Sequence, residues 1–142
     1  LKTKKMGRVF FNTRKNVHSL TAAYTVLASD SGKVFTLNAA AGAGITLPSV
    51  ADMGEGWNCR FIVGTAFATT DWIITATAAI MVGGMNELEV DTSDDGPSTV
   101  AGTTINLELG AETIGDYIDM VVADGKIYIN GQSKLDGAFT IA

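Results

Sequence analysis

The sequence predicts an all-β protein: a jelly-roll-like sandwich or barrel of short antiparallel strands with an extended basic N-terminal arm. In several segments apolar and polar residues alternate with a period of two, which is typical of strands with one buried face. Turn dipeptides such as Asp124-Gly125 and Asn130-Gly131 separate these segments. Helix signals are few. Roughly nine or ten short strands divided by turns indicate a sandwich or barrel.

The arm is predicted from charge. Residues 1–18 contain only basic charges, from Lys2, Lys4, Lys5, Arg8, Arg14 and Lys15. The rest of the chain holds four basic and fifteen acidic residues, so the two parts carry +6 and −11, which gives the net −5. A cationic segment with no core of its own is expected to order only against a partner. We therefore predict an arm over residues 1–20 and a single β domain over residues 21–142.

Three segments alternate clearly and are expected to be half-buried antiparallel strands: residues 33–38, 104–109 and 126–130. Residues 117–122 are similar. The segments Trp57–Val63 and Trp72–Ala76 are apolar on both faces, and only 18% of all residues are charged, against about a quarter in a typical soluble domain. We expect these segments to be central strands, or strands that face the core on one side and a neighbouring subunit on the other, and the low charge fraction favours an oligomer. The residues expected at the subunit interface are Trp57, Phe61, Val63, Trp72 and Ile74.

Turn and cap signals predict the connections. Asp124-Gly125 lies between two alternating segments and predicts a hairpin. The glycines at 42–44 predict a second hairpin, between the strands near residues 35–37 and 45–47. Ser49 to Asp52 fits a capping box, which Gly54 and Gly56 limit to about one turn of helix. Because no repeat of about 20–50 residues is visible, a solenoid is not expected.

Residues that support catalysis or metal binding are scarce. His18 is the single histidine and falls in the predicted arm, whereas Cys59 falls in an apolar strand and is expected to be a small core residue. Paired carboxylates leave glycosidase-like chemistry formally open. The acidic segment from Asp91 to Gly96 matches the first half of a calcium loop, but Gly102 occupies the position of the bidentate glutamate. We expect a non-enzymatic protein without cofactor or metal.

The arm itself has three possible uses: nucleic-acid binding, solvation without a partner, or docking on an acidic protein surface. The acidic body disfavours nucleic acid. Two adjacent phenylalanines favour protein docking, because they offer apolar anchors between the charges. The residues expected to dock are Lys2, Lys4, Lys5, Arg8, Phe10, Phe11, Arg14 and Lys15. The longest apolar stretch, Trp72–Val82, is about half the length of a membrane span.

Several segments between Leu20 and Gln132 carry a family resemblance. They are Ser31-Gly32 at a strand opening, Thr46-Leu47-Pro48 at a strand end, Arg60–Val63, Trp72 at a strand start, and Ile114–Tyr117. In their order they resemble small structural proteins of tailed bacteriophages, of the capsid decoration (cement or head-stabilising) type. The same module also resembles phage fibre and spike domains.

This resemblance implies a virion protein on the outer surface of the capsid, which decorates and stabilises the shell by bridging capsomers. The implied partners are the major capsid protein and further copies of the chain, as a homotrimer, with no nucleic acid and no membrane. The alternative is a receptor- or glycan-binding domain of a phage tail fibre or spike.

Overall fold

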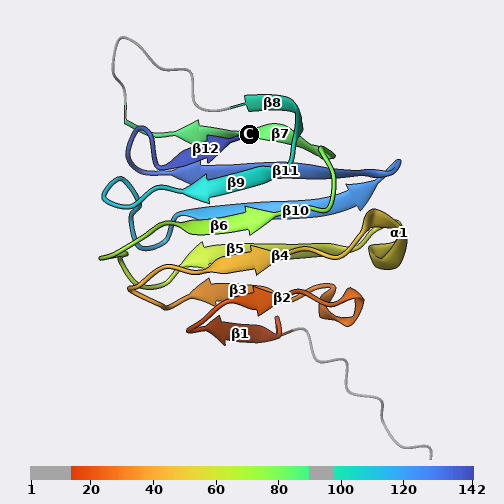
Figure 1. Ribbon diagram of the computed structural model, residues 1–142, viewed down its shortest axis with the longest axis horizontal. Helices are drawn as coiled ribbons and strands as arrows, with labels where there is room; N and C mark the ends of the chain where they lie inside the picture. The colour runs from red at the N-terminus through yellow and green to blue at the C-terminus, as the bar shows by residue number, and fades with distance from the viewer. Residues whose placement is uncertain (1–13, 90–97) are drawn as a thin grey trace, which may run out of the picture.

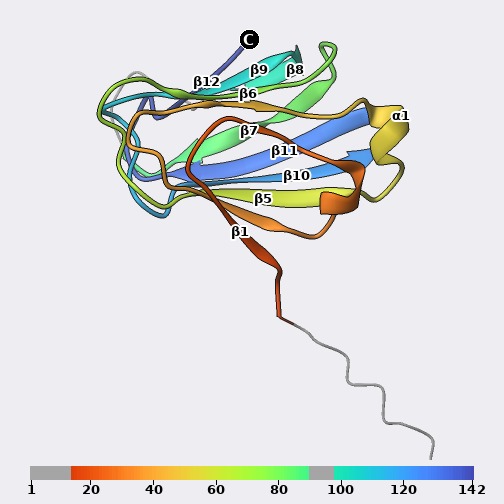
Figure 2. The ribbon, with the colours of Figure 1, turned by 60° about the horizontal axis from the view of Figure 1, so that its bottom comes forward.

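The computed structural model describes residues 14–89 and 98–142, which form two mixed β-sheets that face each other (Figures 1 and 2). The larger sheet contains, in spatial order, β1 (Val17–Leu20), β3 (Val34–Leu37), β5 (Asn58–Val63), β10 (Tyr117–Ala123), β11 (Lys126–Ser133), β7 (Met81–Glu87) and β8 (Ser98–Gly102). The smaller sheet contains β12 (Phe139–Ile141), β9 (Thr104–Leu107), β6 (Trp72–Thr75), β4 (Gly44–Thr46) and β2 (Tyr24–Thr25). The prediction of an all-β fold is confirmed.

The first six strands alternate between the two sheets. As a result β1, β3 and β5 lie side by side in parallel, and so do β2, β4 and β6. The prediction of uniformly antiparallel strands is wrong, because five of the ten pairings within the described residues are parallel. The hairpin expected around residues 42–44 is wrong for the same reason. Strands β3 and β4 belong to different sheets, and the glycines between them cross from one layer to the other.

Each passage of the chain from the large sheet to the small sheet and back forms one winding, and these windings stack in parallel. This arrangement is a feature of solenoids, although the sequence contains no repeat and predicts no solenoid. Leu20, Leu37 and Val63 are adjacent across the large sheet, yet they are 17 and 26 residues apart along the chain. Because the windings differ in length, the constant period that identifies a solenoid in a sequence is lost.

The second half of the chain closes the sandwich with antiparallel strands. Strand β10 lies between β5 and β11 and is antiparallel to both. The predicted hairpin between β10 and β11 is confirmed: Asp124 has φ 52° and Gly125 has φ 70°. Two consecutive positive φ angles are what a two-residue type I′ turn requires. In the small sheet, β9 pairs antiparallel with both β6 and β12.

Helical structure is confined to two short elements of the described chain, α1 (Val50–Met53) and the 3₁₀ turn η1 (Ala28–Asp30). The predicted cap of α1 is confirmed. The hydroxyl of Ser49 accepts a hydrogen bond from the backbone N–H of Asp52 at 3.1 Å, and Gly54 ends the helix with φ 80°. Neither helix is long and apolar enough to cross a membrane, as judged over the described residues.

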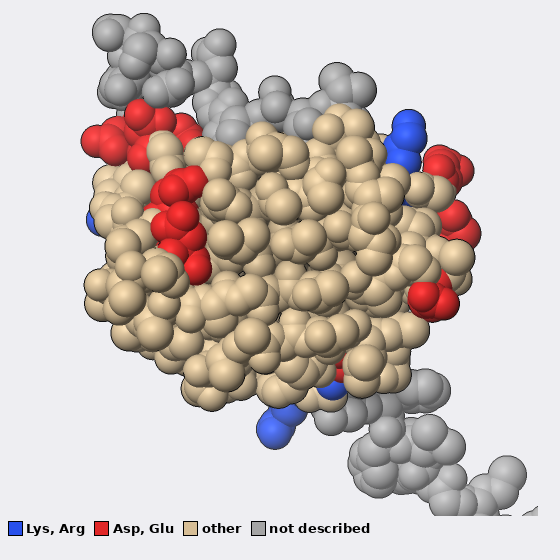
Figure 3. Space-filling model, viewed as in Figure 1, with Lys and Arg blue, Asp and Glu red and all other residues tan. Residues whose placement is uncertain are grey.

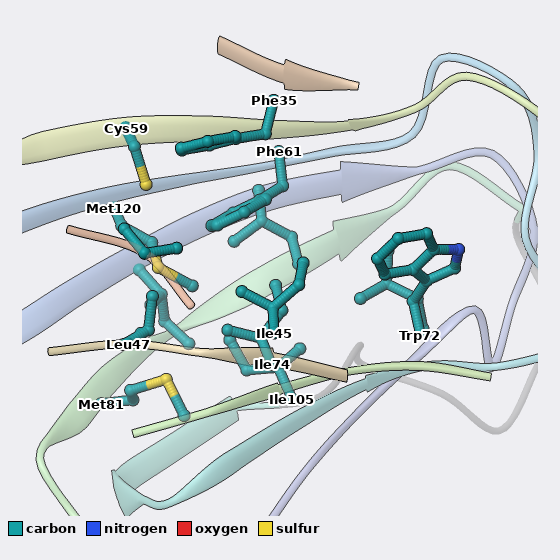
Figure 4. Packing of buried hydrophobic residues seen from close by; sticks show 14 of the residues in the cluster. Phe35, Ile45, Leu47, Cys59, Phe61, Trp72, Ile74, Met81, Ile105 and Met120 are labelled. Carbon is teal, nitrogen blue, oxygen red and sulfur yellow. The ribbon is translucent and has the colours of Figure 1, made fainter. Parts of the chain in front are cut away.

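The core lies between the sheets and takes its side chains from both of them (Figure 4). Phe35 and Phe61 stack with ring centroids 5.1 Å apart. The indole of Trp72 is fully buried and donates its N–H to the carbonyl oxygen of Ala39 at 3.2 Å. Cys59 is buried, as predicted, and this burial raises the pKa of its thiol. The thiol is therefore a small core group rather than a reactive one.

The residues predicted at the subunit interface also belong to this core. Trp57, Phe61, Val63, Trp72 and Ile74 each expose 2% or less of their surface within a single chain. The structure corrects the prediction, because side chains already buried in one chain have no surface left to bury against a second one. Their strands point other residues outward, among them the half-buried Ile62 and the exposed Ile73.

The predicted boundary between arm and domain is also corrected. Strand β1 begins at Val17 and pairs in parallel with β3, so residues 17–20 belong to the domain. Leu20 is buried in the core. His18 is not part of a free basic segment either: its ring meets Tyr24 edge-on at 4.9 Å and lies 5.8 Å from Phe35.

Candidate functional site

A groove of about 420 Å³ lies on the outer face of the seven-stranded sheet, where β3, β5 and β10 run side by side. The segment that leads into β1 contributes Lys15 to its wall. The side chains of Lys33, Arg60 and Asp119 also line it, together with apolar atoms of Val34 and Ile62. The volume is in the usual range for a ligand site. The groove therefore combines charged groups with an apolar floor.

Arg60 and Asp119 form the central ion pair of the groove. They are direct cross-strand partners on β5 and β10. The Nε and Nη2 atoms of Arg60 each donate to one carboxylate oxygen of Asp119 at 2.6 Å. The guanidinium also lies over the ring of Tyr117, 4.5 Å from its centroid. The hydrogen bonds to Asp119 raise the pKa of Arg60 further above its already high value.

Lys33 is held by a buried carboxylate beside the groove. Its ammonium donates to Oδ1 of Asp30 at 2.6 Å, while the N–H of Leu27 and the hydroxyl of Tyr24 donate to Oδ2. Burial by itself disfavours the ionised form of Asp30. The hydrogen bonds from Lys33, Leu27 and Tyr24 outweigh that effect and hold the pKa of Asp30 below its ordinary value. Asp30 thus stays charged and fixes the position of the Lys33 ammonium group.

A second buried carboxylate, Asp116, ties two loops together away from the groove. It accepts backbone hydrogen bonds from Thr113 at 2.7 Å and from Lys134 at 3.0 Å. Desolvation by burial raises the pKa of Asp116 despite these bonds. Because both oxygens face backbone donors of its own loops, the role of Asp116 is structural.

The middle of the outer face of the five-stranded sheet is uncharged, and Glu108 lies at its edge, where it accepts a hydrogen bond from the hydroxyl of Thr140 on β12. Strands β2, β4, β6, β9 and β12 contain no Lys, Arg, Asp or Glu. Figure 3 views this face and shows charged side chains gathered towards its ends, with none over its middle. A row of threonines crosses it from strand to strand: Thr25 pairs with Thr46, Thr46 with Thr75, and Thr75 with Thr104. The two broad faces of the sandwich therefore differ in chemistry.

The predicted docking residues are only partly described. Arg14 and Lys15 lie just before β1, and Lys15 borders the groove. The other six, namely Lys2, Lys4, Lys5, Arg8, Phe10 and Phe11, lie outside the described residues, as does the candidate calcium segment Asp91–Gly96. The described part of the chain contains no group of three or more side chains suited to hold a metal ion.

Sequence reasoning missed Lys33, Arg60 and Asp119 as site residues. A signal for Arg60 was present: a lone cation at the centre of an apolar strand must point outward or be paired. No comparable signal linked it to Asp119, because 59 residues separate them and only the register of β5 with β10 joins them.

Comparison with known proteins found no matching family model, no matching curated protein and no matching solved structure.

Proposed function

We propose that this chain is a non-enzymatic virion protein that decorates the outer surface of a tailed-phage capsid and stabilises it by bridging capsomers. The observation that carries the proposal is the contrast between the two broad faces of the sandwich. One outer face has a groove lined by cations beside the start of the basic arm, and the middle of the other face carries no charge. In this proposal the first face contacts the major capsid protein and the second contacts further copies of the chain.

Self-association through the uncharged face has an electrostatic reason. Residues 19–142 carry a net charge of −11, so two copies repel each other wherever charged surfaces meet. The middle of the face formed by β2, β4, β6, β9 and β12 brings no charge into contact, because these strands contain no Lys, Arg, Asp or Glu. Its threonines offer both methyl groups for packing and hydroxyl groups for hydrogen bonds. We place the contacts of the proposed homotrimer here, in place of the five buried residues.

Bridging follows from the combination of contacts. A copy that holds the shell by its arm and is joined to neighbouring copies cannot leave unless several contacts break together, because linked contacts gain from effective concentration. The sandwich then acts as a rigid building block, which is the role of jelly-roll domains in viral capsids. The proposal involves no cofactor, metal, nucleic acid or membrane.

The arm is proposed to supply the main capsid contact. Exposed ion pairs contribute about 0–1 kcal/mol each, whereas burial of an aromatic side chain contributes about 1.5–3 kcal/mol. Changing both Phe10 and Phe11 to Ala should therefore weaken binding more than neutralising Lys4 and Lys5. Added salt should weaken the wild type and the aromatic double variant by a similar factor, since both retain the same charges.

Two measurements test the function. Quantitation of the protein in purified particles should give hundreds of copies per capsid, whereas a few copies would place it at the tail and overturn decoration. Titration of undecorated capsids at low and high salt gives the affinity of the wild type, of the variants above and of the chain without its arm. If the armless chain binds as tightly as the full chain, the arm is not the capsid contact.

One observation favours the alternative of a receptor- or glycan-binding domain. A small hollow of about 150 Å³ on the same sheet is lined by Asp119, Tyr128 and Asn130, among others. A partly exposed aromatic ring next to carboxylate and amide groups is a combination that suits sugar hydroxyls and ring faces. The copy number per particle separates this alternative from decoration.

A further inference from the structure

The cations of the domain are concentrated at the groove. The described residues contain six Lys and Arg side chains, and three of them line it: Lys15, Lys33 and Arg60. Among the acidic side chains that the structure describes, only Asp119 lines it, with Asp30 beneath Lys33. Three cations against these two carboxylates leave a local charge of +1 on a strongly acidic domain. The groove is therefore the place on the described surface where an anionic group meets least repulsion.

The pairs that are already formed leave donors for an incoming carboxylate. Arg60 uses Nε and one N–H of Nη2 for Asp119, so three of its five N–H groups remain, two of them on Nη1. Its side chain is 42% exposed. Lys33 is 23% exposed and has given one ammonium N–H to Asp30. Lys15 is exposed and forms no salt bridge within residues 14–89 and 98–142.

The floor of the groove favours a peptide over a polyphosphate. Val34 and Ile62 present apolar atoms next to the cations. A glutamate side chain offers both methylene groups and a carboxylate, whereas a polyphosphate has no apolar part to bury there. A long polyanion would also extend over the acidic remainder of the domain, where like charges repel it.

We propose that the groove binds an acidic, extended segment of the protein on which the arm docks. This inference rests on the proposed function, because that function supplies the partner. Lys15 belongs to the stretch that joins the arm to β1, so a partner held by the arm is already next to the groove. A weak second contact then gains strongly from effective concentration.

The first experiment needs no capsid. The ¹⁵N-labelled full chain is titrated with an octaglutamate peptide, and an octaglutamine peptide serves as the uncharged control. The amides of Lys33, Asn58 and Arg60 should shift with octaglutamate alone, while those of Thr46 and Thr75 on the opposite face should not move. Absence of shifts at the groove overturns the inference, and so does an equal response to octaglutamine.

Two variants alter the groove charge without touching a buried group. Lys15→Glu reverses one exposed cation, and Asn58→Asp adds a carboxylate of the same size to the exposed start of β5. Each should weaken octaglutamate binding by roughly twofold to fivefold. Lys126→Glu is the matched control: it makes the same charge reversal at an exposed position of the same sheet, outside the groove. A loss of equal size in Lys126→Glu would show only a net-charge effect and would overturn a specific site.

Undecorated capsids separate this inference from the function on which it rests. We expect Lys15→Glu and Asn58→Asp to bind capsids more weakly than wild type and Lys126→Glu. If all four proteins decorate equally, decoration stands and the groove is not part of the contact. If octaglutamate occupies the groove but no protein binds capsids, the acidic-segment site stands and the proposed function fails.

Discussion

Arg60 and Asp119 face each other directly across β5 and β10, and two parallel hydrogen bonds of 2.6 Å join them. Both side chains are about 40% exposed, so water screens their attraction. We expect Arg60→Ala and Asp119→Ala each to lower the free energy of unfolding by about 1 kcal/mol. A double-mutant cycle by urea denaturation should give a coupling of less than about 1 kcal/mol that shrinks in high salt. A coupling several times larger would show that the pair behaves as buried.

We expect Asp30 to contribute more to the free energy of unfolding than the Arg60–Asp119 pair does. Its removal in Asp30→Ala leaves the N–H of Leu27 and the hydroxyl of Tyr24 without their acceptor, at a cost of about 2–3 kcal/mol. Urea denaturation at neutral pH measures this loss. Asp124→Asn is the control, because it removes an exposed carboxylate at a hairpin turn and asparagine tolerates the positive φ of that position. A loss no greater than that of the control would show that the Asp30 contacts contribute little.

The contribution of Asp30 should also depend on pH in a defined direction. Its folded pKa lies below the ordinary 3.8, so the stabilisation is fully present above that value and is lost as the pH falls through the folded pKa. The difference in stability between wild type and Asp30→Ala should therefore narrow as the pH falls below 3.8. Asp116 titrates in the opposite sense, since its folded pKa is raised, but it is common to both proteins and cancels in the difference. A difference that stays constant in acid would contradict this assignment.

The parallel strands β7 and β11 approach each other so closely at position 83 that only glycine fits there. A Cβ at this position of β7 would lie 2.0 Å from the carbonyl oxygen of Ile129 on β11, and the residue has φ 141°. Gly83→Ala should destabilise the domain by about 3 kcal/mol or more, because backbone must move. Gly44→Ala on β4 is the matched control: its added Cβ meets nothing within 4 Å and should change stability by less than about 0.5 kcal/mol. Thermal melts followed by circular dichroism distinguish the two.

The true start of the domain can be located by truncation. Deletion of residues 1–13 should leave the melting temperature nearly unchanged. Deletion of residues 1–18 removes half of β1, including His18, whose ring contacts Tyr24 and Phe35, and should lower the melting temperature clearly. Equal melting temperatures for the two truncated chains would show that β1 adds nothing to the sheet.

The uncharged face should not tolerate charge if copies meet there. Thr46→Glu places a carboxylate in the middle of the threonine row, and Asn86→Glu adds the same charge to an exposed position on the opposite sheet. Multi-angle light scattering at micromolar concentration should show a trimer for wild type and for Asn86→Glu, and a monomer for Thr46→Glu. A wild-type monomer, or a trimer in all three, would remove this face from the proposed interface.

The sequence predicts where the strands lie in the chain better than it predicts which strands pair with each other. Period-two alternation located β3, β9 and β11, but alternation is the same in parallel and antiparallel strands, so it could not reveal that the chain crosses between sheets after each early strand. The Asp124-Gly125 hairpin was predictable because two neighbouring residues determine it.

Two residues of the groove were predictable as exposed or paired: Lys15, from the single-signed charge of its segment, and Arg60, as a lone cation in an apolar strand. The remainder depends on pairings between distant segments, such as that of Arg60 with Asp119. The expected subunit interface failed for a related reason. In a chain that forms two sheets, a strongly apolar strand packs against the opposite sheet of the same molecule, and Trp72 and Phe61 do so.

The alternation of β1 to β6 between the layers has a consequence for how the protein folds. None of these strands can pair with the next one in the chain, so each early pairing requires the chain to visit the opposite sheet and return. Among these strands, β5 is separated from its second pairing partner by the longest stretch of chain, because that partner, β10, begins more than fifty residues later. Such non-local closure is slow. During synthesis the N-terminal windings expose an open sheet edge until β10 and β11 emerge, and the local β10–β11 hairpin is then the element best placed to complete the sheet.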